Sequence, residues 1–240
     1  MVALVLRLVF VCRLPALPLY WDEPHYDGFG KLYAGVWSLA GQPAAFLAEL
    51  RAVFERTIWK GEAYCATIGL VYALAGAQPR AVFILQAVAD TLGCLCVYGI
   101  ALELGGGTVG IIALVLASLY EPFIFTAARL QSETLSSCLF VGALWAILSA
   151  TSRWEIARYV LAGVLLALAM LMRQALQYMF PLLLLLVPVR QWGTPWRRHM
   201  TMALAFSAGF FVLIGPRLLV TDSLFGHPIW GGVRNPIINA

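Results

Sequence analysis

Long apolar runs, separated by short polar breaks, make up most of this 240-residue chain. The runs are rich in Leu, Ala, Val and Phe and lack strict two-residue alternation, which is typical of membrane-spanning helices and not of barrel strands. We therefore predict an all-α fold, a polytopic transmembrane helical bundle. Breaks at Gly, Pro and charged residues divide the chain into apolar segments at 1–19, 63–77, 80–102, 108–128, 133–150, 158–172, 174–189 and 200–220.

Residues 20–62 depart from this pattern. They mix carboxylates with Trp, Tyr and Phe and with cations such as Lys31 and Lys60. Such a composition favours helices that lie along a membrane interface. We interpret residues 20–62 as a first external loop with interfacial helices, within a single transmembrane domain over 1–240.

Composition supports a membrane protein. The chain is 62% hydrophobic and 12% charged, with a formal net charge of +4, which makes it far more apolar than an average soluble domain. Its arginines concentrate in the polar breaks, which suits control of topology better than nucleic-acid binding. The five cysteines are scattered through apolar segments, so neither a disulfide framework nor a zinc site is indicated.

Two basic breaks predict the sidedness. Residues 151–158 hold two arginines against one glutamate, and residues 190–199 hold three arginines and no acid. By the positive-inside rule, both breaks face the cytoplasm. Counting segments backward places 129–132 outside and 103–107 inside, and counting forward places the chain after about residue 217 outside.

The side of the acidic stretch WDEPHYD (21–27) depends on the segment 63–77. This segment has roughly 15 residues, whereas a spanning helix needs about 20. If it only dips into the interface, the stretch is external, on the side of 129–132. If it crosses the membrane, the stretch is cytoplasmic.

Charged residues near the predicted external ends form a candidate site. They are Asp22, Glu23, Arg129, Glu133, Arg173, Arg217 and Arg234. Carboxylates facing arginines at a membrane surface suggest a reaction in which a base takes a proton from an acceptor while cations hold a phosphate leaving group. A lipid phosphate substrate fits this place, because its tail can stay in the bilayer while its head meets the site.

Simpler interpretations of the same residues stay open. Glu133 can be a helix-start acid favoured by the helix dipole, with Ser132 as the cap. Arg173 and Arg217 can extend toward the interface, although arginines are less expected on the external side than on the internal one. An anionic partner is therefore the alternative that we favour for them.

Two other motifs are weaker. His25, together with Asp22, Glu23 and Asp27, is a candidate ligand set for a divalent cation, and a solvated acidic loop is the alternative interpretation. No pair of histidines has the spacing of a zinc-binding helix. The run GGG at 105–107 lacks the Lys and the strand-to-helix context of a phosphate loop, so we predict a turn there.

Four stretches of the chain, taken in order, carry a resemblance to a known family. They are WDEPHYDGFGKLYAG, ARLQSETL, LAGVLLALAMLMRQ and IGPRLLVTDSLFGHPI. They resemble the first-loop acidic motif, the second-loop Ser-Glu element, the helix ending in Leu-x-Arg and the late Pro-Arg segment of GT-C membrane glycosyltransferases. The group in question is that of the dolichyl-phosphate-mannose protein mannosyltransferases and lipid A aminoarabinose transferases, which is glycosyltransferase family 39-like. In the first stretch, Asp22, Glu23, Tyr26, Gly30 and Gly35 occupy the motif positions.

The resemblance implies roles for the charged residues. Asp22 would be the base acting on the acceptor, with Glu23 beside it. The catalytic candidates are thus Asp22, Glu23 and Glu133, and the phosphate-binding candidates are Arg129, Arg173 and Arg217. Gln174 and Leu218 stand where the group usually has Pro and Asn.

The resemblance also implies the function. The expected enzyme is an inverting glycosyltransferase that moves a sugar from a polyprenyl-phosphate-linked donor to a protein, lipid or glycan acceptor. It would be a multi-pass protein of the inner or plasma membrane, with interfacial helices in an external first loop and its active site on the extracytoplasmic side. A divalent cation is the one cofactor left open, and nucleic acid is not an expected partner. Because such enzymes usually continue through more helices, we expect 1–240 to be the N-terminal portion of a longer enzyme.

Two rival classes remain as alternatives. A membrane transporter would carry charges near the bilayer midplane, beside broken helices in repeated halves, whereas the charges here gather toward one predicted face. A non-catalytic lipid-binding or assembly subunit with the same fold is the other alternative.

Overall fold

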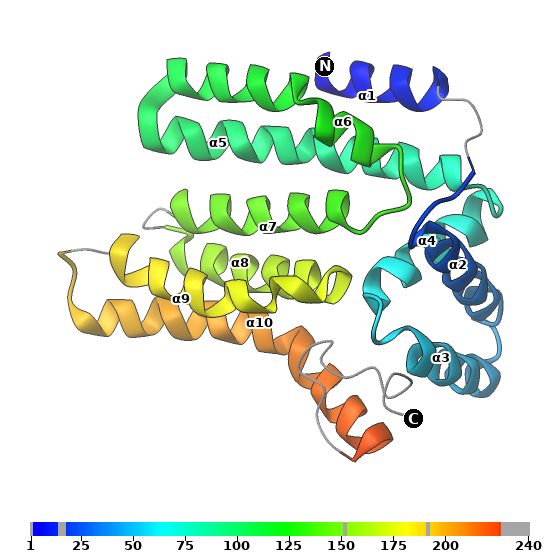
Figure 1. Ribbon diagram of the computed structural model, residues 1–240. Helices are drawn as coiled ribbons and strands as arrows, with labels where there is room; N and C mark the ends of the chain where they lie inside the picture. The colour runs from blue at the N-terminus through cyan, green and yellow to red at the C-terminus, as the bar shows by residue number, and fades with distance from the viewer. Residues whose placement is uncertain (1, 14–17, 151–152, 191–192, 227–240) are drawn as a thin grey trace.

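The computed structural model describes residues 2–13, 18–150, 153–190 and 193–226, so His227 and Arg234 lie outside the described residues. Every regular element in this part of the chain is helical, which confirms the predicted all-α fold. One set of helices runs side by side as a bundle, and a second set lies across one end of it (Figure 1). The bundle helices are α1 (Val2–Arg13), α5 (Pro79–Leu119), α7 (Glu133–Leu148), α8 (Glu155–Met172), α9 (Met179–Arg190) and α10 (Trp196–Phe225). The helices across the end are α2 (Glu23–Ser38), α3 (Pro43–Thr57) and α4 (Glu62–Ala75).

The surface of the bundle suits lipid. Within the described chain, α5, α8 and α10 are long and apolar enough to cross a membrane. Large apolar side chains stay exposed on their outer faces, as at Leu116, which is 66% exposed, and Leu204, which is 64% exposed. Extended apolar surface of this kind marks a membrane or protein contact.

Helix α5 is a hairpin of two antiparallel arms (Figure 1). The reversal lies at Gly106, whose φ of 77° and ψ of −174° are not helical. Arg7 of α1 pairs with Asp90 on one arm and donates to the Ser118 carbonyl on the other at 3.1 Å. A straight helix would separate Asp90 from Ser118 by about 42 Å, at about 1.5 Å per residue. The predicted turn at 105–107 is therefore confirmed.

The second arm of the hairpin is shorter than predicted. It ends at Leu119, and a short helix α6 (Glu121–Ala127) follows. Between them Tyr120 is extended, with φ −68° and ψ 108°, and Pro122 lies in the first turn of α6. Proline is tolerated at the start of a helix but not inside one, so the predicted segment 108–128 divides here.

The centre of the bundle is the contact of α8 with α7 and α10. Gly163 of α8 lies against the Phe206 carbonyl, and Gly209 of α10 lies against the Val160 carbonyl, so closely that a Cβ at either glycine would overlap the oxygen. Small residues at such a crossing let two membrane helices approach backbone to backbone. This contact holds α8 against α10 along the centre of the bundle.

The predicted segment 63–77 forms one of the helices across the end of the bundle, α4. Helix α4 packs on α2 through Gly30, which faces Ile68, and Gly69, which faces Tyr33. It lies with α2 and α3 at the end where α7 begins (Figure 1). The acidic stretch 21–27 is therefore on the side of 129–132, as expected if α4 does not cross the membrane.

The bundle ends also follow the predicted grouping of loops. The reversal of α5 and the first residues of α8 and α10 lie at one end, and the start of α7 and the end of α8 lie at the other, next to α2 and α4 (Figure 1). One boundary differs from the prediction. Residues 174–189 begin with a 3-10 helix, η1 (Gln174–Tyr178), before α9 starts at Met179, because Arg173 is extended and breaks the helix after α8.

Candidate active site

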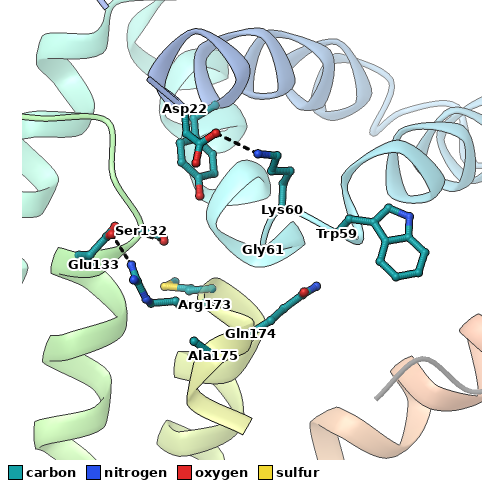
Figure 2. Close-up of a pocket in the computed structure, with 11 residues that line it drawn as sticks. Asp22, Trp59, Lys60, Gly61, Ser132, Glu133, Arg173, Gln174 and Ala175 are labelled. Carbon is teal, nitrogen blue, oxygen red and sulfur yellow. Dashed lines mark hydrogen bonds and ion pairs between the residues drawn. The ribbon is translucent and has the colours of Figure 1, made fainter. Parts of the chain in front are cut away.

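A cavity of about 310 Å³ lies where the helices across the end meet the bundle. Its walls come from the start of α2, the turn before α4, the start of α7 and the end of α8 with η1 (Figure 2). The lining residues are Asp22, Tyr26, Trp59, Lys60, Gly61, Ser132, Glu133, Met172, Arg173, Gln174 and Ala175. Three of the predicted site residues, Asp22, Glu133 and Arg173, are therefore brought together from distant parts of the chain.

Two carboxylate–cation pairs face each other across this cavity (Figure 2). Lys60 Nζ lies 2.9 Å from Asp22 Oδ1, and these side chains are 40% and 60% exposed. Arg173 pairs with Glu133, and their side chains are 41% and 43% exposed. Ion pairs this open to solvent contribute about 0 to 1 kcal/mol each. Both pairs can therefore exchange partners with an incoming charged group at low cost.

Tyr26 and Ser132 add hydroxyl groups to the same wall. Burial raises the pKa of the Tyr26 hydroxyl above its ordinary value of 10.0, and a hydrogen bond with Ser132 opposes that shift. Tyr26 therefore keeps its proton at neutral pH. Ser132 precedes α7, but its side chain makes no capping hydrogen bond to that helix. The predicted cap at Ser132 is therefore absent, and its hydroxyl lies on the cavity.

Glu23 lies beside Asp22 in the sequence but has a different environment. Its side chain is 2% exposed and accepts hydrogen bonds from Arg129 Nη2 at 2.6 Å, from the Leu130 amide at 3.0 Å and from the Tyr20 amide at 2.8 Å. The guanidinium of Arg129 also lies 5.6 Å from the Tyr20 ring centroid. Neither Glu23 nor Arg129 lines the cavity; together they tie the start of α2 to the loop before α7.

Arg217 is likewise outside the cavity. It is buried in an ion pair with Glu62, the first residue of α4, with side chains 5% and 8% exposed. Of the three arginines predicted to hold a phosphate, Arg173 alone reaches the cavity wall. The sequence pattern placed all three near one end of the bundle, and their packing separated them.

The residues proposed as cation ligands are not brought together. Asp27 accepts a hydrogen bond from the Tyr72 hydroxyl at 2.7 Å and pairs with Lys31 at 2.6 Å, while Glu23 is held by Arg129 and His25 is exposed. Among the residues that the structure describes, no group of three or more His, Cys, Asp or Glu side chains is placed to hold a metal ion. Asp27 is instead held by Tyr72 and Lys31, apart from Glu23.

Sequence reasoning missed Lys60 and gave Gln174 no role. Lys60 lies 38 residues from its partner Asp22, and nothing in the local pattern of residues 20–62 distinguishes it from the other cations there. Gln174 donates to the Ile58 carbonyl and hydrogen-bonds Glu62. The one feature of the sequence that could have indicated Gln174 as a site residue is its position directly after Arg173.

Comparison with known proteins identifies the family. Residues 63–219 match the family model described as dolichyl-phosphate-mannose-protein mannosyltransferase. The chain belongs to this family. Its members are membrane glycosyltransferases of GT-C fold, so the chain is an integral multi-pass membrane protein. No curated protein and no solved structure gave a significant match.

The matched range divides the candidate site. Glu133 and Arg173 lie inside it, whereas Asp22, Tyr26 and Lys60 precede it. The resemblance seen in the sequence to this family is confirmed, and the roles of individual site residues rest on their geometry.

Proposed function

We propose that this protein transfers a sugar from a polyprenyl-phosphate-linked donor to a hydroxyl group of a protein, lipid or glycan acceptor. Membership of the mannosyltransferase family supports a dolichyl-phosphate-linked sugar as the donor. The observation that carries the proposal is the cavity, in which Asp22 and Lys60 face Glu133 and Arg173 at the end of an apolar bundle.

Lys60 and Arg173 are the proposed ligands of the donor phosphate. Both are half-exposed on the cavity wall, so the phosphate can reach them. Charge-assisted hydrogen bonds from Lys and Arg are the strong contacts for phosphate oxygens. The phosphodiester of the donor carries one negative charge and the phosphate that leaves carries up to two, so these cations stabilise the transition state more than the ground state.

Asp22 is the proposed general base. When the donor phosphate attracts Lys60, the Asp22 carboxylate loses its counter-charge and can accept the proton of the acceptor hydroxyl. The acceptor oxygen then forms a bond to the anomeric carbon from the face opposite the phosphate. The bond from that carbon to the phosphate oxygen breaks, and the electron pair leaves with the phosphate. Attack from the opposite face inverts the anomeric configuration.

Glu133, Tyr26 and Ser132 are the proposed contacts of the sugar and the acceptor. All three residues line the cavity, where their carboxylate and hydroxyl groups can hydrogen-bond the hydroxyl groups of a sugar. The basic breaks at the far end of the bundle favour a cytoplasmic position for that end, so the cavity is proposed to open on the extracytoplasmic side.

Reconstitution tests the proposal. The purified chain in proteoliposomes should release dolichyl phosphate from labelled dolichyl-phosphate-mannose only when an acceptor is present, and it should not use a sugar nucleotide. The transporter alternative predicts movement of solute or lipid across the bilayer without cleavage of the donor. Flux without any sugar transfer would overturn the proposed function.

A further inference from the structure

We infer that Arg217 and Glu62 form a clasp that positions Lys60 in the cavity, so that Arg217 is a positioning residue and does not touch the donor. The inference rests on the proposed function, because Lys60 acquires its role as a phosphate ligand there.

The clasp joins two elements that are far apart in the sequence. Glu62 and Arg217 are separated by 155 residues, and both side chains are buried. Helix α10 bends in its second half (Figure 1) and contains Pro216 next to Arg217. A proline inside a helix removes a backbone hydrogen bond and produces such a bend. Arg217, directly after this proline, reaches Glu62 at the start of α4.

Other contacts hold the same turn, residues 58–62. Gly61 has a φ of 80°, and a Cβ on it would overlap the Met172 carbonyl at the end of α8. The Trp59 ring lies 6.4 Å from the ring of Phe225, near the end of α10. The Gln174 amide donates to the Ile58 carbonyl. The turn is thus held against α8, η1 and α10 together.

Lys60 lies inside this turn, two residues before Glu62. The backbone position of the turn therefore decides where the Lys60 ammonium group lies relative to Arg173. The turn contacts both neighbours of Arg173 in the sequence, Met172 and Gln174. The phosphate needs both cations at once. Displacement of Lys60 would weaken its charge-assisted hydrogen bond to the phosphate, so loss of the clasp should act on donor binding without removing any group from the cavity.

A double-mutant cycle separates positioning from direct binding. We compare Glu62→Gln, Arg217→Met and the combined variant, with dolichyl-phosphate-mannose as the donor. If Arg217 positions Lys60 through Glu62, each single variant should raise the donor KM about 10- to 100-fold, the loss expected for a hydrogen bond to a charged group, with a smaller change in kcat. The combined variant should be no worse than either single one, because it leaves no unpaired buried charge. Arg217→Lys should recover part of the loss.

The opposite result has a distinct signature. If Arg217 binds the phosphate itself, Glu62→Gln removes a carboxylate that competes for it, so the donor KM should stay unchanged or fall while Arg217→Met raises it. That outcome would overturn the inference. The matched control is Glu155→Gln at the far end of the bundle, whose carboxylate is also 8% exposed and is paired with Arg198 at 2.7 Å. It should leave the donor KM unchanged.

Hydrogen exchange tests the clasp without any activity. In the peptide 58–65, the Lys60 amide donates to the Thr57 carbonyl at 2.8 Å. Amide exchange in this peptide should be faster in Glu62→Gln and in Arg217→Met than in the wild type, and unchanged in Glu155→Gln. Unchanged exchange in 58–65 would overturn the clasp. If the wild-type chain transfers no sugar from any lipid-linked donor, the proposed function is contradicted. The hydrogen-exchange result then still tests whether Arg217 and Glu62 hold the turn at 58–62.

Discussion

Replacement of Asp22 by Asn is the sharpest test of the catalytic assignment. The side chain is 60% exposed, and its one described ion pair is with Lys60 at 2.9 Å. Asn has nearly the same shape but cannot accept a proton at neutral pH. An exposed pair of this kind contributes about 0 to 1 kcal/mol to stability, so the variant should fold and insert as the wild type does.

The expected effect on the reaction is much larger than the effect on folding. General-base catalysis contributes about 100- to 10,000-fold to a rate, which corresponds to about 2.7 to 5.4 kcal/mol of transition-state stabilisation at about 1.36 kcal/mol per factor of ten. The loss should appear in kcat. The donor KM should not rise, because Lys60 is no longer held by a carboxylate and is free for the phosphate.

The assay is acceptor-dependent release of dolichyl phosphate in proteoliposomes, with kcat and donor KM measured separately. Asp27→Asn is the matched control, because Asp27 lies on α2, the helix that Asp22 precedes. Asp27 bonds to Tyr72 and Lys31 and does not line the cavity. It should keep kcat within about threefold of the wild type, well below the smallest effect expected from loss of a general base. An Asp22→Asn variant that turns over as fast as Asp27→Asn would refute the assignment of the base.

Further predictions test the other parts of the site and the fold. Lys60→Met should raise the donor KM about 10- to 100-fold with little change in kcat, since a charge-assisted hydrogen bond is worth about 1.5 to 3 kcal/mol. Lys60→Arg should retain most of the affinity for the donor. A donor KM of Lys60→Met equal to that of the wild type would contradict the phosphate role. Glu23→Gln should reduce the free energy of unfolding by about 3 kcal/mol, because it leaves the Arg129 charge without its partner, and a thermal melt in detergent measures this. Gly209→Ala should lower the same melt by overpacking worth about 1 to 3 kcal/mol; an unchanged Tm would show that the crossing of α8 and α10 is looser than the structure indicates. Cysteines introduced at 27 and 131 should react with an impermeant thiol reagent from the same, external side, and labelling from opposite sides would overturn the topology.

The sequence alone predicted the parts of the structure that depend on local pattern. Apolar length, with breaks at Gly, Pro and charge, is enough to predict spanning helices, because each must satisfy its backbone hydrogen bonds within itself in a bilayer. The glycine run at 105–107 predicted a turn. Gly106 adopts a φ of 77° there, which residues other than glycine rarely adopt. The division of 108–128 at Tyr120 was missed, although Pro122 was its local signal.

Tertiary packing decided what the charged residues do. Asp22 and Glu23 are neighbours in the sequence, yet the exposed fraction of their side chains is 60% for Asp22 and 2% for Glu23. Asp22 precedes α2 and lines the cavity, whereas Glu23 begins α2 and is held by Arg129. Arg173 and Arg217 fit one prediction equally well, and only the first lines the cavity. The ion-pair partner of each of these four residues lies tens to more than a hundred residues away in the sequence. Only the packing of the helices therefore shows which carboxylate is open to solvent and which is buried.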